Sequence, residues 1–448
     1  MRLHPRFMRT RVMRSRFTRA VLTAAGLATV ATGFSVTRYV LAHPGYSLQQ
    51  NVATWARNNG LGPVVDRLEL WLHSEAPSTA PAVSLALEPL TADTVTPGTD
   101  PATTVPSTTT TSVPTTTTSV TPAAPVAPGG TTTTVQTTTT TSTIPPPTDV
   151  APVITPALRG EGQWKVLFAL GKKKVPVVWG MSVRPFRTYG SVVATAAVFD
   201  QTRLHAAMFN GSDVPGGGPW INSKKIPAAG LRGVIAAFNG GFRFEHDPGG
   251  YVTEGATVRK MKRGFATIGI GSDGVMKVGV WGDDMRAGTG WLSLRQNLPP
   301  LVHKGRATWQ DFKWTDWGTD FGDKVYTYRS GLCRRTDGSL MYVSAGDVNI
   351  DLFARMMLQF GCDTAMQLDI NGNWPHFSTY SNFGARTRYG KPLDVRMGDP
   401  QRFLKGYDKD FFALFDPRSV PDGVLWDGTV VTTTVPAATT SSPVATSP

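Results

Sequence analysis

A short stretch after an apolar run brings together the side chains that could do chemistry in this chain. Residues 368–374 read Leu-Asp-Ile-Asn-Gly-Asn-Trp, so one carboxylate, two amides and one indole lie close together. Such a run can suggest calcium, but an EF-hand loop needs glycine at its sixth position and an acid at its twelfth. Counted from Asp369, glycine is fourth and Tyr380 is twelfth, so calcium is not expected. Because Asn371-Gly372 is also a strong turn signal, the stretch predicts either a polar ligand site or a tight turn.

A helix and a strand are expected to position Asp369. Residues 350–360 carry apolar side chains at helical spacing, with Asn349 as the N-cap and Gly361 at the C-terminal end. The apolar run 365–368 then predicts a buried strand, and Asp369 comes where that strand ends. Ligand sites in sheet proteins favour the carboxyl ends of strands.

Two other segments carry groups suited to sugars and phosphates. Asn239-Gly240-Gly241 follows the apolar strand 234–238, so the backbone can approach a ligand closely and Asn239 can hydrogen-bond sugar hydroxyls. A glycine bulge without a ligand explains the same residues. Arg329 ends the run 325–328, where an inward guanidinium would bind a phosphate or carboxylate through two hydrogen bonds.

Residues 158–427 are expected to form one folded domain made mostly of strands. Short apolar or alternating runs recur there, and Asp273-Gly274 and Asp337-Gly338 lie between paired runs, as hairpins require. Strands joined by hairpins, with a few helices, predict an α+β domain with a mostly antiparallel or mixed β-sheet.

The N-terminus has the pattern of a membrane-inserted segment. Residues 1–19 hold seven arginines and no acid, and residues 20–37 are uncharged. We therefore expect a basic cytoplasmic arm (1–19) and a transmembrane anchor or signal segment (20–42), with the rest of the chain outside the cytoplasm. Length and arginine content favour an uncleaved anchor, whereas cleavage after residues 40–42 would give a secreted protein. The adjacent apolar segment argues against a nucleic-acid-binding arm.

Composition separates three further segments. Residues 43–76 contain a capping box, Ser47 with Gln50, and two runs at helical spacing, which predict a short helical hairpin on the membrane or on the main domain. The linker 77–157 and the tail 428–448 are rich in Thr, Ser and Pro and are expected to be disordered, because they bury too little apolar surface.

Charge and cysteine content bound the partners. Residues 158–427 hold 35 Lys and Arg against 25 Asp and Glu, a net charge of +10, which suits anionic cell-envelope glycans, although a solvated cationic surface is equally common. Cys333 and Cys362 are the two cysteines of the sequence. A disulfide between them is possible in an exported protein, but their spacing leaves it open. Two cysteines form neither a zinc site nor a redox motif, and we expect no cofactor and no metal.

The order of several motifs resembles the phosphodiester glycosidase family. They are the strand and glycine pair at 236–242, the runs at 265–270 and 296–302, and the segments 328–332 and 361–369. The family commonly continues its Leu-Asp with glycines and a serine, whereas this chain continues with Ile370-Asn371. It is therefore similar to a bacterial branch with a Leu-Asp-Ile-Asn variant of the motif.

The resemblance implies a hydrolase in which Asp369 and Arg329 are the catalytic residues. Asp369 would stabilise an oxocarbenium ion or activate water, and Arg329, together with His376, would hold the phosphate. A phosphate monoester leaves readily, so a strong general acid is less needed. A second carboxylate could come from Asp347 or Glu254. The residues expected to bind the sugar are Asn239, Gly240, Gly241, Asn371, Asn373 and Trp374.

The function expected on these grounds is an anchored, extracytoplasmic hydrolase that cleaves the glycosidic bond of sugar-1-phosphodiesters in envelope glycans. The alternative is a non-catalytic glycan-binding or wall-assembly module, displayed on its spacer to bind anionic polymer.

Overall fold

The computed structural model describes residues 30–42, 48–72, 74–85 and 144–419, apart from positions 214, 289, 314–316, 318–324 and 373. The expected basic arm at 1–19, residues 86–143 of the expected linker and the expected tail therefore lie outside the described residues. The described part is rich in strands that pair antiparallel in three sheets, with few helices. The predicted β-rich α+β class is confirmed.

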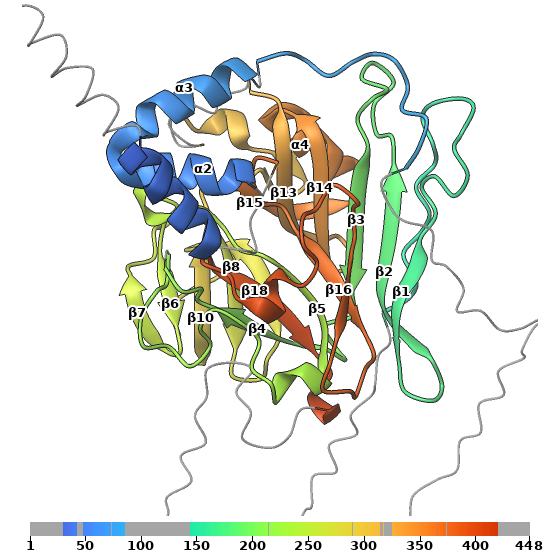
Figure 1. Ribbon diagram of the computed structural model, residues 1–448. Coiled ribbons are helices and arrows are strands. Elements are labelled where there is room, and N and C mark those ends of the chain that lie inside the picture. The colour runs from blue at the N-terminus through green and yellow to red at the C-terminus, as the bar shows by residue number, and fades with distance from the viewer. Residues whose placement is uncertain are drawn as a thin grey trace, which may run out of the picture. The chain divides into compact units, whose positions relative to one another are not determined.

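The largest sheet contains the strand that carries Asp369. It has eight strands, and β15 lies between β13 and β11 (Figure 1). Asp337-Gly338 joins β13 to β14 in the predicted hairpin. The order is β1 (Lys165–Leu170), β2 (Val175–Val183), β3 (Ala194–Phe199), β14 (Leu340–Val348), β13 (Thr327–Arg335), β15 (Cys362–Ile370), β11 (Val302–His303) and β12 (Arg306–Ala307).

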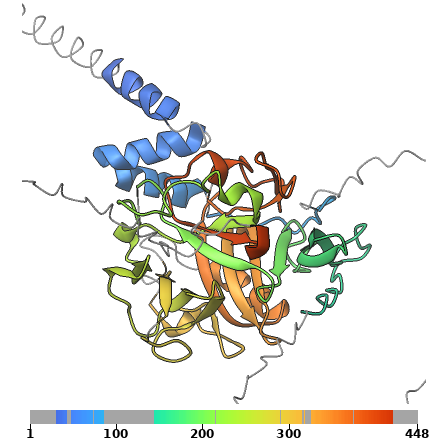
Figure 2. The same ribbon diagram turned by 90° about the horizontal axis from the view of Figure 1, so that it is seen from below.

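Two five-stranded sheets supply the other walls of the domain. In one, Asp273-Gly274 forms the predicted hairpin between β8 and β9, and in the other β5 lies between β16 and β18. In Figure 2 the orange strands β13 to β15 lie beside the yellow strands of the first of these sheets, in agreement with the contacts of β15 with β8 and β9. The orders are β7 (Ala256–Arg259), β6 (Tyr251–Thr253), β10 (Trp291–Gln296), β8 (Ala266–Gly271), β9 (Met276–Val280), and β17 (Tyr389–Pro392), β16 (Phe377–Ser381), β5 (Val234–Asn239), β18 (Phe411–Phe415), β4 (His205–Phe209).

One helix packs against the strand that carries Asp369. The predicted helix is α4 (Ile350–Gln359), and Asn349 caps it by accepting a hydrogen bond from the Leu352 backbone amide at 2.9 Å. Its apolar face packs in a core cluster with β14 and β15. Gly361 follows with φ +81°, a conformation that glycine adopts without strain. The sequence pattern therefore located the helix, its cap and its stop.

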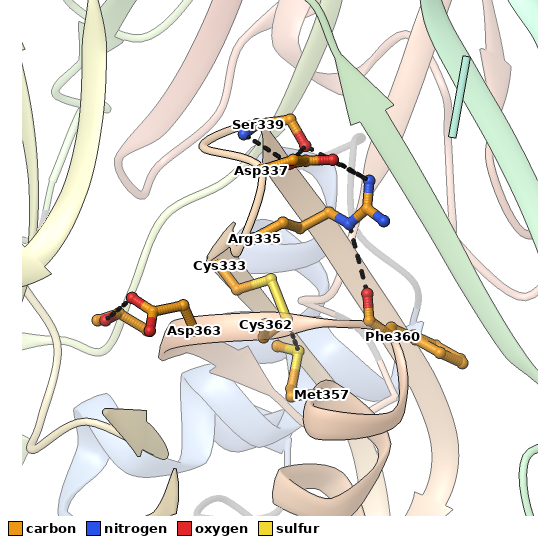
Figure 3. The surroundings of a disulfide bond; sticks show 9 residues. Cys333, Arg335, Asp337, Ser339, Met357, Phe360, Cys362 and Asp363 are labelled. Carbon is orange, nitrogen blue, oxygen red and sulfur yellow. Dashed lines mark hydrogen bonds and ion pairs between the residues drawn. A yellow bond between two sulfur atoms is a disulfide. The ribbon is translucent and has the colours of Figure 1, made fainter. Parts of the chain in front are cut away.

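The two cysteines join the ends of adjacent strands. Cys333 of β13 and Cys362 of β15 form a disulfide across a sequence separation of 29 residues (Figure 3). The bond closes a loop that contains β14 and α4, so it ties together the elements that precede Asp369. The sequence left a disulfide between these cysteines open, and the structure contains it.

The N-terminal part of the described chain is helical. Residues 30–42 are helical, and α2 (Leu48–Ala56) and α3 (Gly62–Leu72) are separated by the irregular turn Arg57–Leu61, in which Gly60 has φ +81°. Among the described residues no helix is both long and apolar enough to span a membrane. The expected segment 20–42 is described only from residue 30. The short helices are α5 (Arg402–Lys405) and the single turns Gly230–Arg232, Phe244–His246, Trp309–Asp311 and Pro417–Ser419.

Candidate active site

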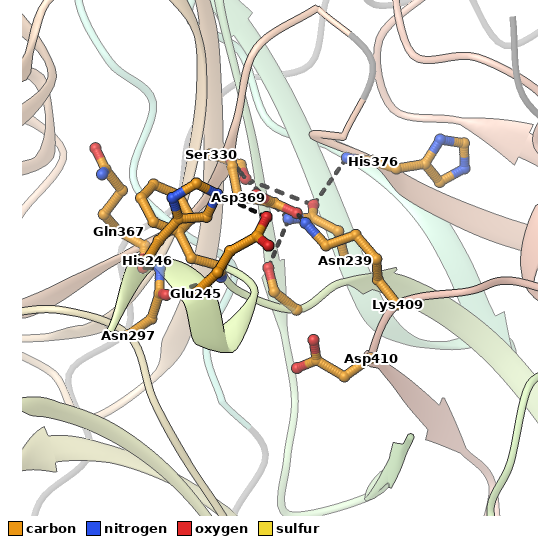
Figure 4. A network of polar contacts seen from close by, with 12 residues as sticks. Asn239, Glu245, His246, Asn297, Ser330, Gln367, Asp369, His376, Lys409 and Asp410 are labelled. Atoms are coloured by element: carbon orange, nitrogen blue, oxygen red, sulfur yellow. Dashed lines mark hydrogen bonds and ion pairs between the residues drawn. The ribbon is translucent and has the colours of Figure 1, made fainter. Parts of the chain in front are cut away.

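Asp369 lies at the carboxyl end of β15, where that strand meets the glycine loop after β5. Its backbone amide donates to the Gly240 carbonyl at 3.1 Å, and its own carbonyl accepts from the Ser330 hydroxyl at 2.7 Å. The side chain is only 6% exposed and forms an ion pair with Lys409. Both partners are thus held in place by strands from different sheets (Figure 4).

Lys409 is the cation of this site. It lies two residues before β18, its side chain is 4% exposed, and its ammonium is 4.6 Å from the centre of the Trp374 ring. Burial and the nearby Arg243 hold the pKa of Lys409 well below its usual value. A buried ammonium with a lowered pKa can stabilise a developing negative charge or release a proton, so Lys409 is a candidate for chemistry as well as for structure.

The glycine loop shapes the floor of the site through its lack of side chains. A Cβ added at Gly240 would lie 2.2 Å from Oδ2 of Asp410, and one added at Gly241 would lie 2.7 Å from Asn297. Both distances are shorter than any contact a real side chain tolerates, so glycine is required at both positions. The two glycines let the side chains of Asp410 and Asn297 approach the backbone closely. This packing accounts for both glycines without a bound sugar.

Beneath the loop lies a fully buried ion pair between Arg295 and Asp410. The Arg295 Nε donates to Asp410 at 2.8 Å, and both side chains have no exposed surface. The remaining guanidinium nitrogens donate to the carbonyls of Gln296 and Phe242, each at 2.7 Å. Because Arg295 belongs to β10 and Asp410 directly follows Lys409, this pair ties the five-stranded sheet of β7, β6, β10, β8 and β9 to the backbone that carries the candidate cation.

Asn239 is a buried structural centre. Its amide nitrogen donates to the Gly240 carbonyl at 2.9 Å and to the Ser330 hydroxyl at 3.1 Å. Its oxygen accepts from the Tyr342 hydroxyl at 3.0 Å and from the His376 backbone amide at 2.8 Å. All the polar atoms of the side chain are therefore engaged within the protein, and a role in binding hydroxyls, which the sequence suggested, finds no free group here.

Arg329 is also engaged within the protein. Its side chain is fully buried, and its three nitrogens donate to the Val348 carbonyl at 2.9 Å, the Gln367 side chain at 2.9 Å and the Val325 carbonyl at 3.1 Å. Burial lowers the pKa of Arg329 to about 9. The Arg329 guanidinium therefore has no free edge for the expected contact with a phosphate, because the β13–β15 register turns this side chain into the core.

His376 faces away from Asp369 and Lys409 (Figure 4). Its Nε2 is 2.8 Å from the Ser378 hydroxyl, its ring lies edge-on to Phe403 with centroids 5.3 Å apart, and the residue has no exposed surface. Burial lowers the pKa of His376 well below its usual value. A neutral, enclosed imidazole is unsuited to the phosphate contact that the sequence suggested.

The buried imidazole predicts a pH-dependent stability. Folded His376 stays neutral, whereas in the unfolded chain it binds a proton below about pH 6.5. His376 therefore does not reduce the free energy of unfolding above that pH. As the pH falls below it, the free energy of unfolding decreases by up to about 1.4 kcal/mol per pH unit. We expect urea titrations between pH 7 and 5 to show a smaller loss for His376→Gln than for the wild type. Equal losses in the two proteins would contradict a neutral buried His376.

The other expected site residues lie in different surroundings. Trp374 is half-buried beside Lys409, and Asn371 has φ +75° and donates from its backbone to the Tyr328 carbonyl at 2.8 Å. Asn371-Gly372 thus does form a turn next to the candidate site. Asn373 lies outside the described residues. Of the two carboxylates proposed as a second acid, Asp347 is exposed, while Glu254 accepts from the Asn222 backbone amide at 2.9 Å.

Sequence reasoning missed Lys409, Asp410 and Arg295. Lys409 is forty positions from Asp369, and its only local signal is a lone basic-acidic pair directly before the apolar run Phe411–Phe415. Glu245 and His246 belong to the single turn Phe244–His246. The charge of Glu245 opposes the lowering of the Lys409 pKa, which burial dominates.

Elsewhere in the described part, one group of side chains has the spacing of metal ligands. Ligand atoms of Asp283, Asp284 and His303 lie within 4.8 Å of one another. Asp283 and His303 also line a cavity of about 480 Å³, together with Arg263 and Arg306. Asp283 is already paired with Lys304 at 2.7 Å, and Asp284 accepts from the Val280 backbone amide at 3.0 Å. These carboxylates are therefore satisfied by protein partners.

Comparison with known proteins agrees with the motif order. The sequence model of the phosphodiester glycosidase family matches residues 232–369, from just before β5 to Asp369. No curated protein matches. A solved structure that the chain resembles is the zebrafish N-acetylglucosamine-1-phosphodiester alpha-N-acetylglucosaminidase catalytic domain auto-inhibited by pro-peptide, with 16% identity over 56% of this chain and 87% of that one and a TM-score of 0.38. Another is a hypothetical protein from Synechocystis, with 11% identity over 54% of this chain and 62% of that one and a TM-score of 0.32.

The matched segment holds the glycine loop, Arg295, Arg329 and, as its last residue, Asp369. Lys409 and Trp374, which complete the surroundings of that carboxylate, lie beyond it. Residues 232–369 of this chain are thus similar to the phosphodiester glycosidase family.

Proposed function

We propose that this protein hydrolyses sugar-1-phosphodiesters at the glycosidic bond. The observation that carries the proposal is the pairing of Asp369, the last residue of the matched segment, with the buried ammonium of Lys409. In the reaction water adds to the anomeric carbon and the bond from that carbon to the phosphate oxygen breaks. The products are a free sugar and a phosphate monoester.

Asp369 is proposed to act on the sugar side of that bond. Its carboxylate either stabilises the positive charge that develops at the anomeric carbon or takes the proton of the attacking water. Its backbone is fixed by Gly240 and Ser330, so little reorganisation is needed when the charge appears.

Lys409 is proposed to act on the phosphate side. The leaving phosphate gains negative charge as the bond breaks, and an ammonium in a site shielded from water stabilises that charge more than an exposed one would. Lys409 thereby takes the part that the sequence suggested for Arg329 and His376. We propose that those two residues position β13 and β16 through their buried contacts.

The proposed substrates are phosphate-linked glycans of the cell envelope, and the proposed location is outside the cytoplasm, anchored by residues 20–42 or released after cleavage. The net charge of +10 over residues 158–427, from 35 Lys and Arg against 25 Asp and Glu, favours an anionic polymer. The Cys333–Cys362 disulfide suits an oxidising compartment. The arginine-rich start before an uncharged segment favours an anchor with its basic end in the cytoplasm.

A second candidate is a glycan-binding module without hydrolysis. It is favoured by the small exposure of Asp369, 6%, and by the neutralisation of its charge by Lys409. A carboxylate held in this way could be structural.

Hydrolysis in water enriched in oxygen-18 separates these functions. The purified protein would be incubated with a synthetic N-acetylhexosamine-1-phosphodiester, and both products analysed by mass spectrometry. We expect the heavy oxygen in the sugar hydroxyl and none in the phosphate, because the carbon-oxygen bond breaks. Label in the phosphate would show a phosphodiesterase instead, and binding without any product would establish the glycan-binding module.

A further inference from the structure

Helix α3 turns a row of apolar side chains away from the protein. Val64, Leu68 and Trp71 of α3, together with Leu61 at the end of the preceding turn, are 65, 53, 73 and 45% exposed. Their spacing of three, four and three residues places them on one side of the helix. Single exposed apolar residues are common on proteins, but an aligned row ending in a tryptophan marks a surface that contacts something other than water.

Helix α2 also exposes apolar side chains, and it buries polar ones. The polar residues Asn51 and Thr54 are only 2% and 8% exposed, whereas the apolar residues Leu48 and Val52 are 66% and 40% exposed. A helix on a water-facing surface has the opposite arrangement, with apolar residues inside and polar residues outside. We call these exposed apolar residues, Leu48, Val52, Leu61, Val64, Leu68 and Trp71, the outer face of α2–α3, and their exposure favours an apolar partner for both helices.

The chain that leads into this face indicates what covers it. The preceding helical residues 30–42 expose Val30, Phe34 and Leu41 at 72, 71 and 76%. The first part of this helix, up to residue 37, belongs to the uncharged segment 20–37, which directly follows seven arginines. Tryptophan at the end of an apolar row is typical of the boundary between lipid and water.

We propose that α2–α3 is a membrane-interface hairpin whose outer face lies in the boundary region of the lipid bilayer. This inference rests on the membrane attachment proposed above and is independent of the hydrolase chemistry. It gives the chain a second lipid contact beyond residues 20–42. A chain cleaved after residue 42 would then stay at the membrane surface instead of being released.

The test uses the full chain with one added cysteine. Both native cysteines are in the disulfide, so an environment-sensitive fluorophore reacts only with the introduced residue. Leu68→Cys places the label on the outer face, and Arg67→Cys places a matched control on the next residue, about 100° around the same exposed helix. Each labelled protein is added to phosphatidylcholine and phosphatidylglycerol vesicles whose acyl chains are brominated.

We expect the label at 68 to shift to shorter wavelength and to be quenched at least about twofold more than the label at 67. Equal quenching at the two positions would overturn the proposal. So would a shielded label at 68 that depends on protein concentration without vesicles, because that face would then bind a second copy. If the protein floats with the vesicles but neither label is preferentially quenched, residues 20–42 alone attach it to the membrane and the proposal is wrong. The oxygen-18 assay tests hydrolysis separately.

Discussion

Asp369→Asn is expected to lower kcat for sugar-1-phosphodiester hydrolysis by at least about 10²–10³-fold. The amide keeps the volume of the side chain but removes the negative charge that the developing positive charge at the sugar requires. The backbone contacts of residue 369 with Gly240 and Ser330 do not involve the changed atoms, so the strand end should keep its place. Initial rates over a range of substrate concentrations separate this loss from a change in KM.

Two controls make the result specific. Asp363→Asn changes the same type of residue on the same strand, but that carboxylate is partly exposed and pairs with Arg334 near the other end of β15. Its activity should stay within about threefold of the wild type, as expected for a surface ion pair. Asp369→Asn/Lys409→Met removes the unpaired buried ammonium that the single change leaves behind. If Asp369→Asn keeps wild-type kcat, Asp369 has no part in the chemistry, whatever the double variant does.

Asp410→Asn is expected to destabilise the domain by about 3–5 kcal/mol. The change leaves the guanidinium of Arg295 buried without its counter-charge, and a buried charge that loses its partner costs that much. The loss would be measured as the free energy of unfolding in urea, followed by circular dichroism. Since Asp410 follows Lys409 directly, activity is expected to fall as well.

The surface pair Arg306–Asp311 gives the matched control. Its nitrogen and oxygen are 2.6 Å apart, closer than in the buried pair, but the side chains are 66% and 44% exposed. Asp311→Asn should therefore lower the free energy of unfolding far less than Asp410→Asn does, despite the shorter contact. Arg295→Met/Asp410→Leu, which removes both charges, should recover part of the stability lost in Asp410→Asn. Similar losses at the buried and the exposed pair would refute the role given to burial.

Local structure near Asp369 could be predicted because it depends on neighbours in the sequence. Asn349 caps α4 through a side-chain contact with a residue three positions away, and Gly361 ends the helix through its own backbone conformation. Asn371-Gly372 forms the turn that its residue types favour. Such features are decided over a few residues, so spacing and residue type suffice.

Roles that depend on the direction of a side chain could not be predicted in the same way. Arg329 stands in a strand run and His376 in the segment after the Asn371-Gly372 turn, and both side chains are buried in the core. Arg329 donates to the side chain of Gln367 on the neighbouring strand β15, and the His376 ring contacts the hydroxyl of Ser378, two residues further along the chain. The pairing register decides the direction, and register is set by the whole sheet.

The sequence by itself determined the β-rich class, the capped helix before β15, the carboxylate at the end of that strand and the family resemblance. Only the tertiary structure decided that Lys409 pairs with Asp369, whereas Arg329 donates to Val348, Gln367 and Val325 and the His376 ring points away (Figure 4). The physical reason is that an ion pair requires two groups to share a few ångströms of space, while forty residues of chain separate Asp369 from Lys409. Their meeting depends on the order of strands in two sheets, which long-range packing sets and local spacing does not record.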